Sequence, residues 1–420
     1  MQLKIKVSTI VEQSILLYVL VLVFLYDAFV NSIGFIDEFI GLLSFLIFLF
    51  YFAVKGKIVL FRNEYYIILL LGVISVIGLL SNWVNYRNEH VTEGAAIIGD
   101  FIVFYKAFIS YFAVRLLSKK FSTKKVLTKL SKYVKPIFYL LVFIIFIDFI
   151  FKIYPRLPRY GIYSIELFFK HPSRFGFAFS FIFLVLLPKF YKSNKQLLLA
   201  VLLVGLLSLR VKYFGFVGFS LIFMFYGKRL FRVPKLYFIS FIAVLGVIML
   251  WLFWDQFKMY FVFISLDTAW SRAVVLYYSF IIGYDFFPLG TGFGTYSSYY
   301  SGVHYSWVYD LYGINRVFGI SRLYWGFVAD QYWPMVLGQF GYFGFLSFVL
   351  IIYNYFKLFL THIKGNINNS LYYYFISAIL GLLLLLVDST SDAIFTQQRA
   401  VVMFIYFGLI VNTINEKYEE

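Results

Sequence analysis

Residues 254–280 read WDQFKMYFVFISLDTAWSRAVVLYYSF, and the same mixture of charged and aromatic residues continues as far as Trp333. Charges recur too often in this stretch for one helix to cross a membrane there. A segment of roughly 75 residues is far longer than a connector needs to be, and its aromatic content argues against disorder. We therefore expect residues 255–332 to form the working domain, with the rest of the chain as its membrane scaffold. The charged residues of the segment include Asp255, Lys258, Asp267, Arg272, Asp285, Asp310, Arg316, Arg322 and Asp330.

Composition places the chain among membrane proteins. Of its 420 residues, 62% are hydrophobic and only 14% are charged, which no ordinary soluble domain matches. The net charge of +17 is explained better by basic loops on the inner face of a membrane than by nucleic-acid binding. The absence of cysteine excludes disulfides and thiolate chemistry, and four histidines argue against a histidine-rich metal site. We expect no nucleic-acid partner, no metal and no cofactor.

Apolar segments predict an all-α polytopic membrane protein with about twelve transmembrane helices. Alternate loops are basic, which places both termini in the cytoplasm and one large loop domain outside the cell. The predicted domains are an N-terminal bundle (1–195), a hairpin with the following span (196–254), the extracytoplasmic loop domain (255–332) and the C-terminal helices (333–420). The predicted spans lie near 12–33, 36–54, 64–82, 99–116, 137–153, 174–190, 196–209, 213–227, 236–254, 333–356, 371–388 and 396–413.

Residues 196–227 contain two apolar runs, each shorter than the roughly 20 residues of an ordinary span. The flanks on both sides are basic and belong on the same face of the membrane, so the number of crossings must be even. The segment is therefore predicted to be a hairpin with Arg210 and Lys212 at its tip, in the outer leaflet. Cations at that depth mark a functional cavity, or they snorkel to the headgroups and anchor two short helices.

The outer loop at 153–173 is basic, which opposes the usual charge distribution. An anionic ligand would explain this, because guanidinium groups bind phosphate in a bidentate fork, and so would contact with anionic lipid headgroups. All seven tryptophans also fall at outer ends of spans or in outer loops, which is compatible with a carbohydrate site. The charged residues of the loop and of the start of the next span are Arg156, Arg159, Glu166, Lys170 and Arg174.

Two residues of the loop domain are candidate bases. Asp330 stands just before the span that begins near Tyr332, where a carboxylate acts either as a general base or as a helix cap. His304 is the second candidate, although a lone histidine in a loop usually has no such role. The sequence leaves both alternatives open.

The run Pro288-Leu289-Gly290-Thr291-Gly292-Phe293-Gly294 predicts a tight turn. It lacks the strand-turn-helix context of a nucleotide-binding fingerprint. Glycines at Gly290, Gly292 and Gly294 would instead let the backbone approach a ligand closely. The apolar stretch 273–284 before it is too short to span and is expected to be a helix lying on the membrane, with Arg272 at its start.

The order of these motifs carries a family resemblance. The motifs are Leu207-Ser208-Leu209-Arg210, Ser271-Arg272, the glycine run 288–294, Asp330-Gln331-Tyr332 and Gly338-Gln339-Phe340-Gly341-Tyr342-Phe343-Gly344. In this order the chain resembles the O-antigen polymerase and ligase superfamily, in which a membrane bundle carries one large outer loop in its C-terminal half. Ligases of that family have His-Asn where this chain has Asp330-Gln331, which favours the polymerase branch.

The resemblance implies a metal-independent inverting glycosyltransferase. It would polymerise polyprenyl-pyrophosphate-linked oligosaccharide repeats for O-antigen, capsule or exopolysaccharide at the outer face of a bacterial cytoplasmic membrane. Arg210 and Arg272 are expected to stabilise the pyrophosphate leaving group, and Asp330 to accept the proton of the attacking sugar hydroxyl. Besides the lipid-linked substrate and membrane lipids, flippase and chain-length regulator proteins are candidate partners. The predicted substrate contacts are Lys212, Arg174, Arg322, His304, Gly290, Gly292, Gly294, Gln331 and Tyr332.

Three other functions stay open at this point. The main alternative is a flippase or transporter of the same lipid-linked oligosaccharide, and the others are a ligase-type transferase and a peptidoglycan-type polymerase. A flippase should show two similar halves with charges in the spans of both. Here the in-membrane cations and the long loop follow residue 200, and no internal repeat is visible.

Overall fold

The computed structural model describes residues 7–55, 60–117, 121–230, 269–366, 369 and 371–418, together with isolated residues between 240 and 266. These segments are mainly helical, which confirms the predicted all-α class, and one antiparallel pair joins β1 (Leu157–Arg159) to β2 (Ile162–Ser164). The α-helices are α1 (Val7–Leu20), α2 (Val30–Ile33), α3 (Ile36–Lys55), α4 (Arg62–Arg87), α5 (Gly94–Leu117), α6 (Thr123–Phe151), α7 (Pro172–Phe190), α8 (Lys195–Gly205), α9 (Val211–Leu230), α12 (Ser271–Asp285), α13 (Tyr299–Val303), α14 (Trp307–Leu311), α15 (Trp333–Gly365), α16 (Leu371–Asp388) and α17 (Gln398–Tyr418). Short π- and 3-10 helices are η1 (Val21–Leu25), η3 (Leu167–Phe169), η4 (Leu206–Ser208), η5 (Ile314–Arg316) and η6 (Ile394–Thr396).

Seven helices of the described segments are long and apolar enough to cross a membrane, so the chain is a membrane-embedded protein. They are the continuous α1–η1 helix, α4, α5, α6, α7, α15 and α16. The predicted span 236–254 lies largely outside the described residues, and each of the other predicted spans overlaps a helix. The total of twelve crossings therefore stays a prediction.

Two predicted spans differ clearly from the observed helices. The span 137–153 is only the apolar end of α6, which begins at Thr123 after Ser122 accepts the Lys125 N–H as its cap. Lysine is a good helix former, so the basic stretch is helical although hydropathy does not mark it. The span 12–33 is interrupted, because the first helix ends at Leu25 and the short α2 follows after a turn.

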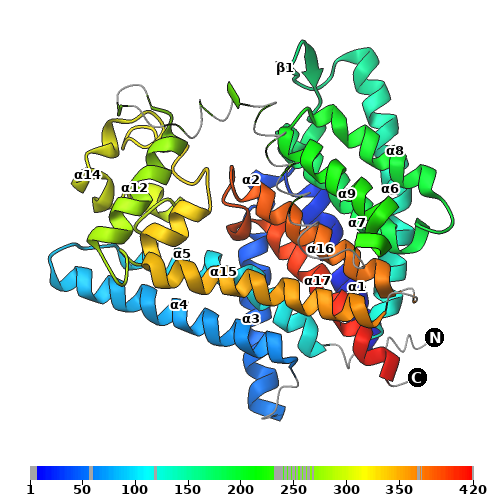
Figure 1. Cartoon of the computed structure of the whole chain (residues 1–420), viewed down its shortest axis with the longest axis horizontal. Coiled ribbons are helices and arrows are strands. Elements are labelled where there is room, and N and C mark those ends of the chain that lie inside the picture. Colours follow the sequence, from blue (N-terminus) through cyan, green and yellow to red (C-terminus); the bar gives the residue numbers. More distant parts are fainter. Residues whose placement is uncertain are drawn as a thin grey trace.

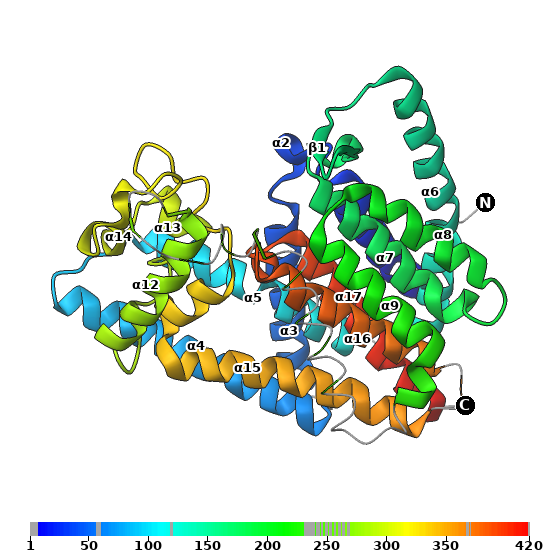
Figure 2. The same ribbon diagram turned by 45° about the horizontal axis from the view of Figure 1, so that its top comes forward.

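The centre of the bundle is formed by α7 and α17. All side chains from Phe175 to Leu187 and from Gln398 to Ile414 are buried, as expected for helices that are apolar on every side. Around them, α5 packs against both α3 and α17, and α16 packs against α7. The long helices α4 and α15 lie side by side along one edge of the molecule (Figures 1 and 2).

Residues 269–332 fold into a small lobe with an apolar core of its own. Its helices α12, α13 and α14 pack around side chains that include Val274, Tyr296, Tyr309 and Ile320. The lobe contacts α15 through α12 and α5 through α13 (Figure 2). The segment is therefore folded, as its aromatic content predicts, while the side of the membrane on which it lies stays a prediction.

The glycine run 288–294 docks onto a break in α15. Gly341 has a left-handed φ of 61°, which interrupts α15 and leaves carbonyls of the preceding turn without their helical partners. The backbone N–H groups of Thr291 and Gly292 donate to two of these carbonyls, at 3.0 and 2.8 Å. The N–H groups of the glycine run thus satisfy carbonyls that the break in α15 leaves without helical partners.

The sequence predicts that the backbone at the three glycines approaches another group closely. In the structure it approaches other parts of the chain. A Cβ at Gly290, Gly292 or Gly294 would lie 2.5, 2.6 or 2.8 Å from another protein atom. The buried carboxylate of Asp100 accepts from the Gly294 N–H and from Gln339 Nε2, both at 2.8 Å. These residues join α5, the glycine run and α15, and the predicted ligand contact of the glycines stays untested.

Candidate functional site

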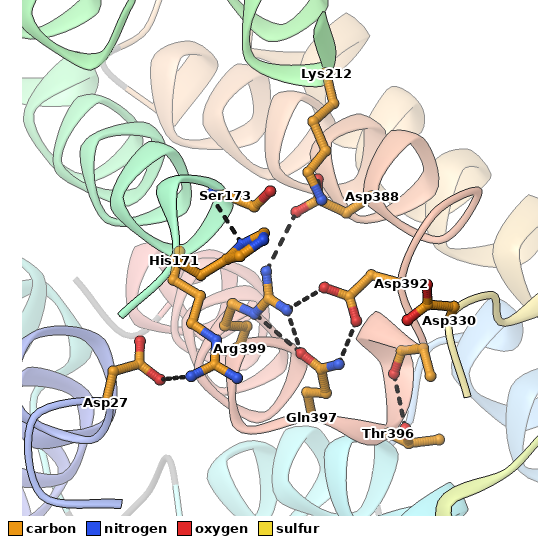
Figure 3. A network of polar contacts seen from close by, with 12 residues as sticks. Asp27, His171, Ser173, Lys212, Asp330, Asp388, Asp392, Thr396, Gln397 and Arg399 are labelled. Carbon is orange, nitrogen blue, oxygen red and sulfur yellow. Dashed lines mark hydrogen bonds and ion pairs between the residues drawn. The ribbon is translucent and has the colours of Figure 1, made fainter. Parts of the chain in front are cut away.

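Charged side chains from distant parts of the chain meet where α7, α9 and α17 begin and α16 ends (Figure 3). The start of a helix carries positive partial charge and N–H groups without helical partners, so three converging starts favour an anion. We call the group the polar cluster. Its members are Asp27, His171, Arg174, Arg210, Lys212, Arg272, Asp330, Asp388, Asp392, Gln397 and Arg399.

Arg399 lies at the centre of the polar cluster. Its Nη2 is 2.5 Å from Asp392 Oδ2 and its Nη1 is 4.0 Å from Asp388 Oδ2, with only 4% of the side chain exposed. The other oxygen of Asp388 contacts Lys212 Nζ at 3.1 Å. Burial raises the pKa of Asp392, but Arg399 and Lys212 outweigh it, so that the pKa lies below its ordinary value. The carboxyl groups of Asp388 and Asp392, one on each side, therefore offset the cost of burying Arg399.

Three of these central residues, Asp388, Asp392 and Arg399, are absent from the predicted site. Their signal in the sequence is position, since Asp388 ends one predicted span and Arg399 lies near the start of the next. An ionisable residue there needs a partner or a cavity. The short polar stretch between the two spans, which contains Asp392, therefore contributes directly to the site.

Arg174 is held inside the protein by a residue that sequence patterns do not mark. Its Nη1 lies 2.8 Å from Oδ1 of Asp27, in the turn after η1. This pair links α7 to the N-terminal helix and compensates the Arg174 charge. A single aspartate in a turn has no sequence signal that predicts such a partner.

His171 caps α7 and contacts Arg210. Its Nδ1 accepts the backbone N–H of Ser173 at 3.2 Å, and its Nε2 lies 3.2 Å from Arg210 Nη2. Burial of part of the ring lowers the pKa of His171, and the nearby cations, Arg210 first among them, bring it to about 3. The residue is nevertheless exposed. The ring is therefore neutral and accessible at physiological pH.

Asp330 is paired with Arg272, whose Nη2 and Nε lie 2.9 and 3.1 Å from the same oxygen, Oδ2. Burial raises the pKa of Asp330, Arg272 opposes the increase, and the neighbouring Asp392 adds to it. Figure 3 shows Asp330 next to Asp392 at the edge of the polar cluster. The cap position of α15 belongs to Tyr332, which makes no side-chain cap bond, so the helix-cap interpretation of Asp330 is wrong.

A pocket lies beside the polar cluster, between α7, α9 and α16. Its empty volume of about 200 Å³ includes space that is open to solvent. Charge reaches it from Arg210, Lys212 and Asp388, and aromatic surface from Phe177 and Tyr213. Cations beside the start of a helix suit a phosphate group.

Gln331 and Tyr332 fasten the start of α15 to the loop after α16. Gln331 Nε2 donates to the Thr390 carbonyl at 3.2 Å, and the Tyr332 N–H donates to the Ser389 carbonyl at 3.1 Å. These bonds place the adjacent Asp330 beside the polar cluster. Their predicted contact with substrate stays untested.

Two predicted substrate contacts, Arg322 and His304, belong to the loop lobe. Arg322 Nη2 lies 2.6 Å from Asp310 Oδ2, and His304 Nδ1 lies 2.6 Å from Glu93 Oε2. Within the described segments neither side chain shares a hydrogen bond or ion pair with the polar cluster. They are therefore not members of the polar cluster.

No family model matches the chain, and no curated protein or solved structure matches it either.

Proposed function

We propose that the chain is a membrane glycosyltransferase of the polymerase branch of the O-antigen polymerase and ligase superfamily. It would join polyprenyl-pyrophosphate-linked oligosaccharide repeats at the outer face of a bacterial cytoplasmic membrane. The observation that carries the proposal is that Asp330, distant in sequence from Arg210 and Lys212, shares one polar cluster with them, and that Arg210 and Lys212 line a pocket there. Glycosyl transfer from a lipid pyrophosphate requires cations for the leaving group and a base for the acceptor hydroxyl.

In the proposed reaction, a hydroxyl oxygen of one repeat attacks the anomeric carbon of another from the face opposite the pyrophosphate. The new carbon–oxygen bond forms while the bond to the pyrophosphate breaks, and the electron pair departs with the pyrophosphate. Arg210 and Lys212 stabilise this developing charge, and the hydroxyl proton passes to Asp330. The proposal requires no metal and no cofactor.

The structure supports a different role for Arg272 from the one expected of it. Both of its contacts with Asp330 go to one oxygen, at 2.9 and 3.1 Å, so Arg272 belongs with the base rather than with the pocket. Within the proposal, Arg272 is a positioning residue that orients the carboxylate toward the acceptor. A base held in a fixed geometry loses less entropy when it reacts.

Substitution of Arg210 tests the proposal. Purified protein in lipid nanodiscs is supplied with the lipid-linked repeat, and the products are separated by length. Arg210→Ala should reduce the polymerisation rate on the order of 100-fold or more, because a charge on the leaving group loses its partner. Arg210→Lys should recover little, since lysine cannot form the bidentate contact. Arg87→Ala, which removes an exposed arginine on α4, is the matched control.

The same preparation separates the alternatives. A flippase would move the labelled lipid-linked repeat across a vesicle membrane without forming polymer. A ligase-type transferase would attach the repeat to a different acceptor and give no ladder of lengths. Polymer formed by Arg210→Ala at the rate of the Arg87→Ala control would contradict the proposed role of the polar cluster.

A further inference from the structure

His171 and Arg210 meet beside the pocket, where α7 and α9 begin. Arg210 and Ser173, which is hydrogen-bonded to His171 in Figure 3, both line the pocket. His171 is an exposed residue, so a ligand can reach it. Which nitrogen atoms of the two side chains carry a proton determines whether this contact can be a hydrogen bond.

The cap of α7 determines which ring nitrogen of His171 carries the proton. Nδ1 accepts the Ser173 N–H at 3.2 Å, so Nδ1 presents its lone pair. A neutral imidazole has one protonated nitrogen, which must then be Nε2. The opposite tautomer would direct Nδ1–H at the Ser173 N–H and leave the first turn of α7 without its cap.

Two hydrogen-bond donors consequently face each other. The guanidinium of Arg210 has only donors, and its Nη2 lies 3.2 Å from the protonated Nε2 of His171. With this tautomer the contact joins two donors and is not a hydrogen bond. Two donors at such a spacing repel each other, and one oxygen about 2.9 Å from both nitrogens can accept from each.

We propose that His171 and Arg210 form a two-donor cradle for an anionic oxygen of a phosphate group. The cradle rests on the proposed function and deepens it, because it adds a neutral donor to the site of the leaving pyrophosphate. The starts of α7 and α9 contribute positive partial charge to the same place. Glu166 also lies within the electrostatic reach of Arg210 and competes with the phosphate for it.

Substitutions at position 171 separate the cradle from the cap. His171→Ser keeps an oxygen that caps α7 but has no donor at the place of Nε2. His171→Asp also caps the helix and puts a negative charge where the phosphate oxygen would lie. His90→Ser is the matched control, because His90 stacks on Trp307 at 4.2 Å and lies outside the polar cluster.

The measurement is the affinity of inorganic pyrophosphate for the full-length protein in zwitterionic nanodiscs, determined by calorimetry. His171→Ser should bind on the order of 10- to 100-fold more weakly, the effect of losing one hydrogen bond to a charged group. His171→Asp should show no measurable binding, and His90→Ser should match the wild type. Unchanged affinity in His171→Ser would overturn the cradle.

Nitrogen NMR of the labelled histidines gives a second readout that a purely structural role of His171 would not move. The His171 ring should carry its proton on Nε2, and this signal should shift when pyrophosphate is added. A proton on Nδ1, or a signal insensitive to every phosphate tested, would also overturn the cradle.

The source of the phosphate is distinguished by the lipid. A shift that appears in phosphatidylglycerol nanodiscs without pyrophosphate assigns the cradle to lipid headgroups, whereas a shift that requires pyrophosphate assigns it to the leaving group. The test is also independent of polymer formation. If the cradle binds pyrophosphate but the wild-type protein forms no polymer, the cradle stands and the proposed function fails.

Discussion

The carboxyl group of Asp330 is partly exposed, and its pKa is raised. Its side chain is 31% exposed, so a substrate hydroxyl can reach it, while burial of the remainder raises its pKa. A carboxylate with a raised pKa accepts a proton more readily when it is ionised. Since Tyr332 occupies the cap position of α15, loss of a cap cannot account for an effect of substituting Asp330.

Asp330→Asn should lower the polymerisation rate on the order of 100- to 10,000-fold, because asparagine keeps the size of the side chain but cannot accept a proton. In the wild type the rate should fall as the pH is lowered through the raised pKa of Asp330, since the protonated acid is no longer a base. Initial rates across acidic and neutral pH check both points.

The assay includes His304→Ala, because the sequence leaves that histidine as a second candidate base. A rate for Asp330→Asn within about threefold of the wild type would assign Asp330 a structural role. Loss of activity in His304→Ala alone would transfer the role of base to His304. Its position in the loop lobe, paired with Glu93, predicts that this does not happen.

At the scale of elements, the break in α15 shows why a glycine run and a glycine-rich helix occur in one chain. A helix interrupted within a membrane protein needs partners for its freed carbonyls. The run 288–294 supplies backbone N–H groups to them, and its glycines allow the two backbones to approach closely enough. The loop lobe is thereby attached to the bundle near the start of α15, which follows Asp330 in the chain.

Gly290→Ala and Gly161→Ala form a matched pair that measures this packing. Both glycines have left-handed φ angles, of 80° and 76°, so alanine costs about 1–2 kcal/mol at either position. At Gly161 a Cβ meets nothing within 4 Å, whereas at Gly290 it would lie 2.5 Å from the Gly341 nitrogen. Gly290→Ala should therefore lower the thermal unfolding midpoint in detergent clearly more than Gly161→Ala. Equal shifts would show that the run does not press against α15.

At the scale of the whole molecule, ionisable side chains within the bundle are paired between helices. Lys106 of α5 lies 2.5 Å from Asp37 of α3, and Arg115 of α5 lies 2.5 Å from Glu64 of α4. Charges that are costly in lipid are thus directed inward and compensated. The pairs also join helices that belong to separate predicted spans.

The hairpin of α8 and α9 makes the membrane topology testable, because the chain has no cysteine of its own. Cysteines at Ser193 and Arg229, both exposed, should react only with a membrane-permeant thiol reagent, since both lie in basic flanks. A cysteine at Val211, beside the hairpin tip, should react with an impermeant reagent added from outside. The measurement is labelling of intact cells followed by mass spectrometry.

The cysteine-free parent controls for background labelling in this experiment. Gly227 is unsuitable as a labelling site, because a side chain there would lie 2.9 Å from the Tyr372 hydroxyl. If Ser193 and Arg229 were labelled from opposite sides, residues 196–227 would cross the membrane once and the twelve-span arrangement would be wrong.

Local chemistry alone determined the class of the protein and the starts of several helices. Composition is sufficient for a helical membrane protein, because a membrane interior accepts few other backbones. The starts of α12 at Ser271 and of α15 at Trp333 follow from changes in hydropathy within a few residues. The same local signals predict that Arg210 stands at a helix end, where α9 does begin.

Only the tertiary structure decided which charged residues share a site. Arg272 and its partner Asp330 are 58 residues apart, and no periodicity in the sequence connects them. Asp388 meets both Lys212 and Arg399 because α16 packs beside α7, α9 and α17, while Arg322 pairs with Asp310 in the loop lobe. An ion pair depends on a distance of a few ångströms, and that distance is set by the packing of whole helices, which no local pattern encodes.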